Sequence, residues 1–201
     1  MKPAYWPPER RAPLPPVQPW SGASEALVRA SDDPWVTPAE IGNFDTTPTY
    51  AQTRAWLAKL SEASPLVRLY EYGTSAEGLP LTLVIASADH ARVMARCQVE
   101  LDVEVHGAGP IRVFTECGIH PGEIDGKDAG LMLLRDIALG GKADVLDGCD
   151  WYFVPVLNPD GHERRSAFSR PNQRGPNEQG WRTGLSEWFS TSTVAICRRS
   201  P

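Results

Sequence analysis

A histidine and a glutamate three positions apart are the residues of this sequence whose types and spacing could do chemistry. His120 and Glu123 flank Pro121-Gly122, a dipeptide typical of a turn. A neutral imidazole nitrogen and a carboxylate oxygen are both zinc ligands, with bond lengths of about 2.0–2.2 Å. A turn of this length lets both side chains point at one ion. From the spacing alone, the alternative is a loop histidine beside a solvated glutamate.

The elements on either side of this pair predict its place at the edge of a sheet. A strand is expected at Ile111–Glu116, and a helix is expected from Gly126 to about Leu139, with Asp125 as its cap and Gly140-Gly141 at its end. Loops at the carboxyl ends of strands are where polar groups gather without disturbing the core. The pair is therefore expected at the rim of a sheet.

The remaining patterns alternate between strands and helices. They predict a helix from Pro48 to about Ala63 with Thr47 as its cap, strands at Val67–Tyr72, Leu81–Ala86, Val99–Val105 and Trp151–Val156, a turn at Leu157–Gly161, and an apolar helix face of Ala129, Met132, Leu133 and Ile137. This order favours an α/β fold with a sheet at its core.

Three motifs in this order resemble the zinc metallocarboxypeptidases, the carboxypeptidase A-like family. Residues 72–78 look like the early Gly-x-Ser-x-Glu-Gly turn, although Leu79 stands where a basic residue is expected. Residues 120–130 resemble the metal-binding loop and the helix after it. Residues 155–164 are similar to the Asn-Pro-Asp-Gly strand end of the family. The resemblance covers residues 47–182.

The resemblance implies a mixed central sheet flanked by helices (phosphorylase/hydrolase-like), incomplete in this chain, with one Zn²⁺ ion at the strand ends. The implied reaction is hydrolysis of the C-terminal peptide bond of a peptide or protein by metal-activated water. His120 and Glu123 match two zinc ligands. Arg182 is the candidate for the catalytic arginine that polarises the carbonyl, and Arg174 is its competitor and a candidate for substrate binding. For both arginines, the alternative is a solvated loop charge.

Two groups that the family needs have no match. After Glu123 the only histidine is His162, which belongs to the Asn-Pro-Asp-Gly turn. The last carboxylate is Glu187, in a segment whose apolar residues show neither helical nor strand periodicity. A third zinc ligand and a general base are therefore missing. We expect the chain alone to hydrolyse peptides poorly or not at all, because two ligands hold zinc weakly and the water lacks a proton acceptor.

The resemblance stops abruptly at Thr183. This predicts a truncated chain, produced by a reading-frame change, a premature stop or a wrongly assigned gene boundary. Two other functions stay open: a non-catalytic remnant that binds peptide or metal weakly, and a related zinc deacylase. The turn at Asn158–Gly161 favours the peptidase over the deacylase.

The organisation along the chain follows from composition. Residues 1–46 are predicted to be a Pro-rich tail and an irregular lead-in, with a short helical candidate at Ala23–Ala30. Residues 47–182 are predicted to form the partial catalytic domain, and residues 183–201 a divergent tail.

Charge and composition exclude several classes of function. Twenty basic against twenty-five acidic residues give a net charge of −5, which argues against a nucleic-acid partner. No apolar run is long enough to cross a membrane, and the N-terminus lacks an export signal. The compartment is cytoplasmic by default, or secreted if the N-terminus is wrongly assigned, and the oligomeric state stays open. The four cysteines are expected to be free thiols, with Cys117 packed inward, and His90 and His106 are expected to be surface or turn histidines.

Overall fold

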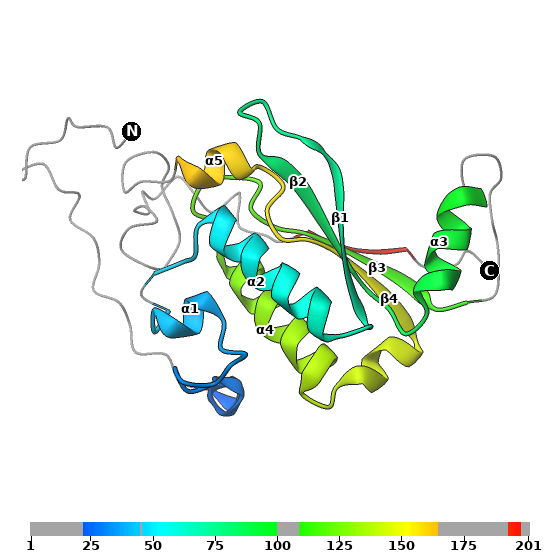
Figure 1. Ribbon diagram of the computed structural model, residues 1–201, viewed down its shortest axis with the longest axis horizontal. Coiled ribbons are helices and arrows are strands. Elements are labelled where there is room, and N and C mark those ends of the chain that lie inside the picture. Colours follow the sequence, from blue (N-terminus) through cyan, green and yellow to red (C-terminus); the bar gives the residue numbers. More distant parts are fainter. Residues whose placement is uncertain (1–21, 45, 100–108, 165–192, 198–201) are drawn as a thin grey trace, which may run out of the picture.

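The structure is a computed structural model that describes residues 22–44, 46–99, 109–164 and 193–197 (Figure 1). In chain order its elements are the 3-10 helix η2 (Ala23–Leu27), α1 (Pro38–Ile41), α2 (Tyr50–Ala63), β1 (Val67–Thr74), β2 (Pro80–Ala86), α3 (His90–Val99), β3 (Ile111–Glu116), α4 (Asp125–Leu139), the 3-10 helix η3 (Ala143–Asp147), β4 (Cys149–Val154), α5 (Pro159–Glu163) and β5 (Thr193–Cys197). The predicted Pro-rich tail lies outside the described residues.

The five strands form one mixed sheet in the order β1-β2-β4-β3-β5. Strands β3 and β4 pair in parallel, whereas the other three pairs are antiparallel. Helices α2 and α4 lie side by side against one face of this sheet (Figure 1). The predicted fold class, a mixed sheet flanked by helices, is confirmed. Within the described residues, no helix combines the length and the apolar character needed to cross a bilayer.

The core lies between the sheet and the two long helices. It is built from aromatic and aliphatic side chains that are almost inaccessible to solvent: Trp56, Leu57, Leu60, Val67, Val84, Ala86, Cys117, Leu131, Leu134, Ile137, Leu146, Trp151 and Phe153. Phe153 is fully buried, and its ring lies 4.9 Å from that of Trp151, centroid to centroid. Cys117 packs inward as predicted, with 2% of its surface exposed.

The apolar face predicted for α4 is wrong in three of its four residues. Ile137 is buried, but Ala129 is exposed, Leu133 is 41% exposed, and Met132 is only partly buried. The physical reason is Gly130, where an added Cβ would lie 2.3 Å from Cζ of Phe153. The helix approaches the sheet through this glycine, so the neighbouring stripe that contains Leu131 and Leu134 faces the core instead.

The start of α2 also differs from its prediction. Thr49 is the N-cap, and its hydroxyl accepts a hydrogen bond from the amide of Gln52 at 3.1 Å. The predicted cap, Thr47, instead donates its hydroxyl to the Asp128 carboxylate of α4 at 2.6 Å, and it accepts from the Lys127 ammonium at 2.8 Å. Thr47 therefore forms a buried polar contact between the segment that precedes α2 and helix α4, and it does not cap α2.

Other predicted boundaries need correction. Asp125 is the first residue of α4, whose N-cap is Ile124 without a side-chain hydrogen bond. Val99, predicted to begin a strand, ends helix α3, and residues 100–105 of that predicted strand lie outside the described residues. In the segment after Thr183, where the sequence shows neither helical nor strand periodicity, strand β5 pairs with β3 in antiparallel fashion.

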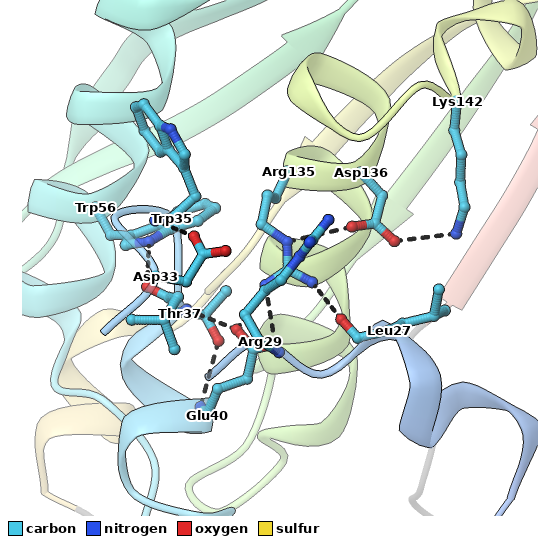
Figure 2. Close-up of polar contacts among 11 residues, drawn as sticks. Leu27, Arg29, Asp33, Trp35, Thr37, Glu40, Trp56, Arg135, Asp136 and Lys142 are labelled. Atoms are coloured by element: carbon cyan, nitrogen blue, oxygen red, sulfur yellow. Dashed lines mark hydrogen bonds and ion pairs between the residues drawn. The ribbon is translucent and has the colours of Figure 1, made fainter. Parts of the chain in front are cut away.

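Residues 22–44 are attached to α4 by a buried group of charges (Figure 2). Arg135 is 1% exposed, and its Nη1 contacts the two carboxylate oxygens of Glu40 at 2.9 and 2.7 Å. Its Nη2 donates to the carbonyl of Leu27 at 2.8 Å, and its Nε contacts Asp136 at 3.2 Å. Lys142 approaches the other Asp136 oxygen at 3.0 Å. This segment is therefore part of the folded domain.

Glu40 is also the third residue of α1, whose N-cap is Thr37. The Thr37 hydroxyl accepts from the Glu40 amide, and the Glu40 carboxylate accepts from the Thr37 amide at 2.6 Å, which completes a capping box. The amide of Arg29 donates to the same carboxylate at 2.9 Å. The pattern Thr37-Pro38-x-Glu40 was visible in the sequence, but the lead-in was predicted to be irregular.

These contacts make stability depend on the charge of Glu40. Burial alone would raise the pKa of this carboxyl, but hydrogen bonds from Arg135 and from the amides of Thr37 and Arg29 outweigh burial and hold the pKa below its ordinary value of 4.5. A depressed pKa contributes stability that is fully present above the unfolded value and is lost as the pH falls through the folded value.

We therefore expect Glu40→Gln to flatten the acid limb of the stability curve. Urea unfolding of both proteins at a series of pH values should show the wild type losing its advantage over the variant as the pH falls below 4.5. All other carboxylates are common to the two proteins, so the difference between the curves isolates Glu40. Two parallel curves between neutral and acidic pH would contradict the prediction.

Candidate metal centre

The loop between β3 and α4 brings His120 and Glu123 together. The His120 Nδ1 and Glu123 Oε1 atoms lie 2.8 Å apart, and the His120 backbone amide donates to Glu123 Oε2 at 2.8 Å. The Glu123 amide in turn donates to the His120 carbonyl at 3.2 Å. Both donor groups of the predicted pair thus face each other at the C-terminal end of β3. Their assignment as zinc ligands stays a prediction.

Glycines allow the loop to take this shape. Gly118 has φ +63° and Gly122 has φ +87°, both in the left-handed region that side chains disfavour. A Cβ at Gly118 would also lie 3.1 Å from Cα and Cγ1 of Val156, so the loop passes close to the chain that follows β4. The loop conformation therefore depends on contacts with the segment after β4.

The pair is accessible, and its donor chemistry fits a metal. The His120 side chain is 34% exposed and that of Glu123 is 17% exposed. Two donors bound to one zinc ion in a tetrahedral arrangement are separated by about 3.3 Å. The observed 2.8 Å separation of Nδ1 and Oε1 is a direct hydrogen-bond distance, so the two side chains must open by about half an ångström to accept an ion.

The Asn-Pro-Asp-Gly motif, predicted to be a turn, forms the short helix α5. Asn158 is its N-cap, with the Oδ1 accepting from the Gly161 amide at 2.9 Å, and Pro159 occupies the first helical position. Five helical residues follow the cap, so the predicted turn is the start of a short helix. The side-chain Nδ2 of Asn158 donates to the Ile119 carbonyl at 3.2 Å, one residue before His120.

The motif at residues 72–78 contacts helix α5. The Ser75 hydroxyl donates to Asp160 Oδ1 at 2.6 Å, and the Glu77 amide donates to Asp160 Oδ2 at 3.2 Å. Arg164 forms an ion pair with Glu77. Helix α5 therefore contacts both the loop between β1 and β2 and the loop that carries His120. The three motifs meet in space although about 90 residues of chain separate the first from the last.

Other candidate residues are placed elsewhere or lie outside the described residues. His162 is 1% exposed, and its Nε2 lies 3.2 Å from the Pro48 carbonyl. His90 begins α3, with its Nε2 3.0 Å from the Leu66 carbonyl. Arg174, Arg182, Glu187 and His106 lie outside the described residues. Among the residues that are described, no three His, Cys, Asp or Glu side chains are grouped to hold a metal.

Sequence reasoning gave no role to several polar residues of the motifs that surround this site. Asp160 lies in the motif at residues 155–164, and Lys127 and Asp128 lie in the motif at residues 120–130, but none of the three was assigned a contact. Lys127 is fully buried, with its Nζ 2.6 Å from Asp128 Oδ1 and 3.3 Å from the Pro48 carbonyl. Adjacent opposite charges in the first turn of a helix were the available signal, because a buried lysine requires such partners.

Comparison with known proteins identifies one family. The sequence model described as zinc carboxypeptidase matches residues 53–193, more than half of the chain. No curated protein sequence matches this chain.

Solved structures that are similar to this chain include two of thrombin-activatable fibrinolysis inhibitor and one of a carboxypeptidase A. Thrombin-activatable fibrinolysis inhibitor has a TM-score of 0.50 and 19% identity over 76% of this chain and 39% of that one. The bovine form in complex with tick carboxypeptidase inhibitor has a TM-score of 0.46 and 18% identity over 67% and 43%. Carboxypeptidase A from Helicoverpa armigera has a TM-score of 0.46 and 24% identity over 59% and 26%. At these identities the likeness concerns the fold, and this chain spans less than half the length of each.

Proposed function

Because this chain belongs to the zinc carboxypeptidase family, we propose that His120 and Glu123 are zinc ligands of a centre that hydrolyses C-terminal peptide bonds. The observation that carries the proposal is the convergence of His120 Nδ1 and Glu123 Oε1 at the C-terminal end of β3, 2.8 Å apart. An imidazole and a carboxylate are a nitrogen and an oxygen donor of the kind that zinc prefers.

The residues of this chain have separate tasks in the proposed site. His120 presents its ring nitrogen, and Glu123 is held for binding by the hydrogen bond that its Oε2 accepts from the His120 amide. The chemistry that bound zinc supplies is polarisation of a peptide carbonyl and a lower pKa for a water molecule. Arg182 is proposed to stabilise charge that develops on the carbonyl oxygen, and Arg174 to bind the terminal carboxylate of the substrate.

The same reasoning predicts weak hydrolysis by this chain. Two protein ligands leave zinc with one fewer than a catalytic centre normally has, and no general base was placed by the sequence. We propose that the chain alone turns over peptides poorly or not at all. A zinc-dependent peptidase activity that stays with the protein through rigorous purification would overturn this part of the proposal.

Zinc titration of the whole chain tests the ligand assignment. We expect one zinc ion per chain, with an affinity that falls sharply in His120→Ala and in Glu123→Gln, because each removes one of two donors. His90→Gln and Glu62→Gln are matched controls, since His90 lies on α3 and Glu62 is an exposed residue of α2. Isothermal titration calorimetry gives both the stoichiometry and the dissociation constant.

The affinity of the wild type separates the two candidate functions. Tight stoichiometric zinc supports a metallopeptidase centre, and binding in the millimolar range supports a remnant that no longer holds its metal. Equal affinities for the wild type, His120→Ala and Glu123→Gln would exclude this pair as the ligands.

A further inference from the structure

The parallel pairing of β3 and β4 continues beyond both strands into the loop that carries His120. The Cys117 amide donates to the Val154 carbonyl at 3.0 Å, and the Leu157 amide donates to the Cys117 carbonyl at 2.8 Å. The Asn158 amide then donates to the Gly118 carbonyl at 3.1 Å. Backbone hydrogen bonds to the end of β4 and to the segment after it therefore fix the first two residues of the loop, Cys117 and Gly118.

The side chain of Asn158 adds one more contact in the same direction. Its Nδ2 donates to the Ile119 carbonyl at 3.2 Å, while its Oδ1 accepts from the Gly161 amide at 2.9 Å. Only this orientation of the amide satisfies both contacts. In the flipped amide, Oδ1 would face the Ile119 carbonyl oxygen and Nδ2 would face the Gly161 N–H, so neither hydrogen bond could form. One side chain thus caps α5 and binds the residue that precedes His120.

Gly161 leaves the room that this amide occupies. A Cβ at Gly161 would lie 2.6 Å from Asn158 Nδ2 and 3.0 Å from its Cγ. Such a distance is too short for a real contact, so any other residue at this position would push the amide away from Ile119. The absence of a side chain at Gly161 therefore allows the Asn158 amide to reach the Ile119 carbonyl.

We propose that Asn158 is a positioning residue for His120. By holding the Ile119 carbonyl, it fixes the backbone from which the imidazole reaches Glu123 and from which the His120 amide donates to Glu123 Oε2. That Asn158 affects metal binding through His120 rests on the proposed function, in which His120 is a zinc ligand. The positioning itself is a property of the metal-free protein and can be measured without zinc.

Asn158→Asp separates the two tasks of the side chain. Aspartate caps a helix as well as asparagine does, so its oxygen keeps the Gly161 amide. It has no N–H to donate, and its second oxygen faces the Ile119 carbonyl, which repels it. Gly161→Ala reaches the same result by a different route, because it displaces the amide without removing a polar group.

Hydrogen exchange of the metal-free protein is the first measurement. In Asn158→Asp and Gly161→Ala, the His120 amide should exchange about tenfold faster than in the wild type, the effect of losing one hydrogen bond that closes the loop. The Gly161 amide should stay protected in Asn158→Asp, which reports that α5 is folded. Asp160→Asn is the matched control, because it loosens the contact with Ser75 and should leave His120 unchanged.

Zinc affinity is the second measurement. Asn158→Asp and Gly161→Ala should bind zinc about 10–100-fold more weakly than the wild type, the usual cost of disturbing a group that orients a ligand. If the wild type binds no zinc through His120, the proposed function fails while faster exchange of the His120 amide still supports positioning. Unchanged His120 exchange in both variants, with Gly161 protected in Asn158→Asp, overturns the positioning role whatever the zinc affinity.

Discussion

Arg135→Met is expected to lower the free energy of unfolding by about 3–5 kcal/mol, because it leaves the Glu40 carboxylate buried without its cation. The two side chains are only 2% and 0% exposed, so water cannot replace the guanidinium. The substitution also removes the donor to the Leu27 carbonyl. Guanidinium chloride unfolding followed by tryptophan fluorescence measures the loss.

A surface ion pair supplies the control for this prediction. Arg54 pairs with Glu71, and their side chains are 31% and 60% exposed. Arg54→Met should cost about 1 kcal/mol or less, because exposed pairs are solvated in both states. The double variant Glu40→Leu/Arg135→Met should recover part of the loss, since neither charge is then left buried. Equal losses for Arg135→Met and Arg54→Met would refute the argument from burial.

Phe153→Ala is expected to be equally severe, at about 3–5 kcal/mol, because it opens a cavity at the centre of the core. The ring of Phe153 is fully buried beside that of Trp151 and fills the space opposite Gly130. The cavity cannot close easily, because α4 and the sheet are each held by their own hydrogen bonds. Equilibrium unfolding in urea gives the change in free energy.

The matched control is the same substitution one strand away. Phe114 on β3 pairs with Tyr152, so its side chain lies on the opposite face of the sheet from Phe153, and it is 36% exposed. Phe114→Ala should cost about 1 kcal/mol, because less apolar surface leaves water there on folding. If Phe114→Ala cost as much as Phe153→Ala, the core would not lie between the sheet and the two long helices.

Most of the sheet could be predicted because its strands carry their own signals. Alternation or continuous apolar runs placed strands close to β1, β2, β3 and β4, and Gly140 ended α4 as expected. The family resemblance also followed from local motifs. These features depend on neighbouring residues, so a single sequence contains them.

The errors concern contacts between distant parts of the chain. Thr47 has a hydroxyl that could cap a helix, but this hydroxyl donates its hydrogen bond to Asp128, which is 81 residues away. The prediction of the buried face of α4 was wrong because Phe153, on strand β4, fills the space opposite Gly130. The role of Asn158 was invisible for the same reason, since its partner Ile119 is 39 residues distant. Local pattern does not determine such pairings.

The attachment of residues 22–44 sets where this domain can be cut. The family match begins at residue 53, inside the first turn of α2. A fragment that starts there would lack the Thr49 cap, the Tyr50 amide that donates to Glu163 at 2.7 Å, and the Glu40 carboxylate that neutralises Arg135. Recombinant expression that follows the family boundary would therefore remove these three contacts and yield a less stable polypeptide, whereas a fragment that begins at residue 22 would keep them.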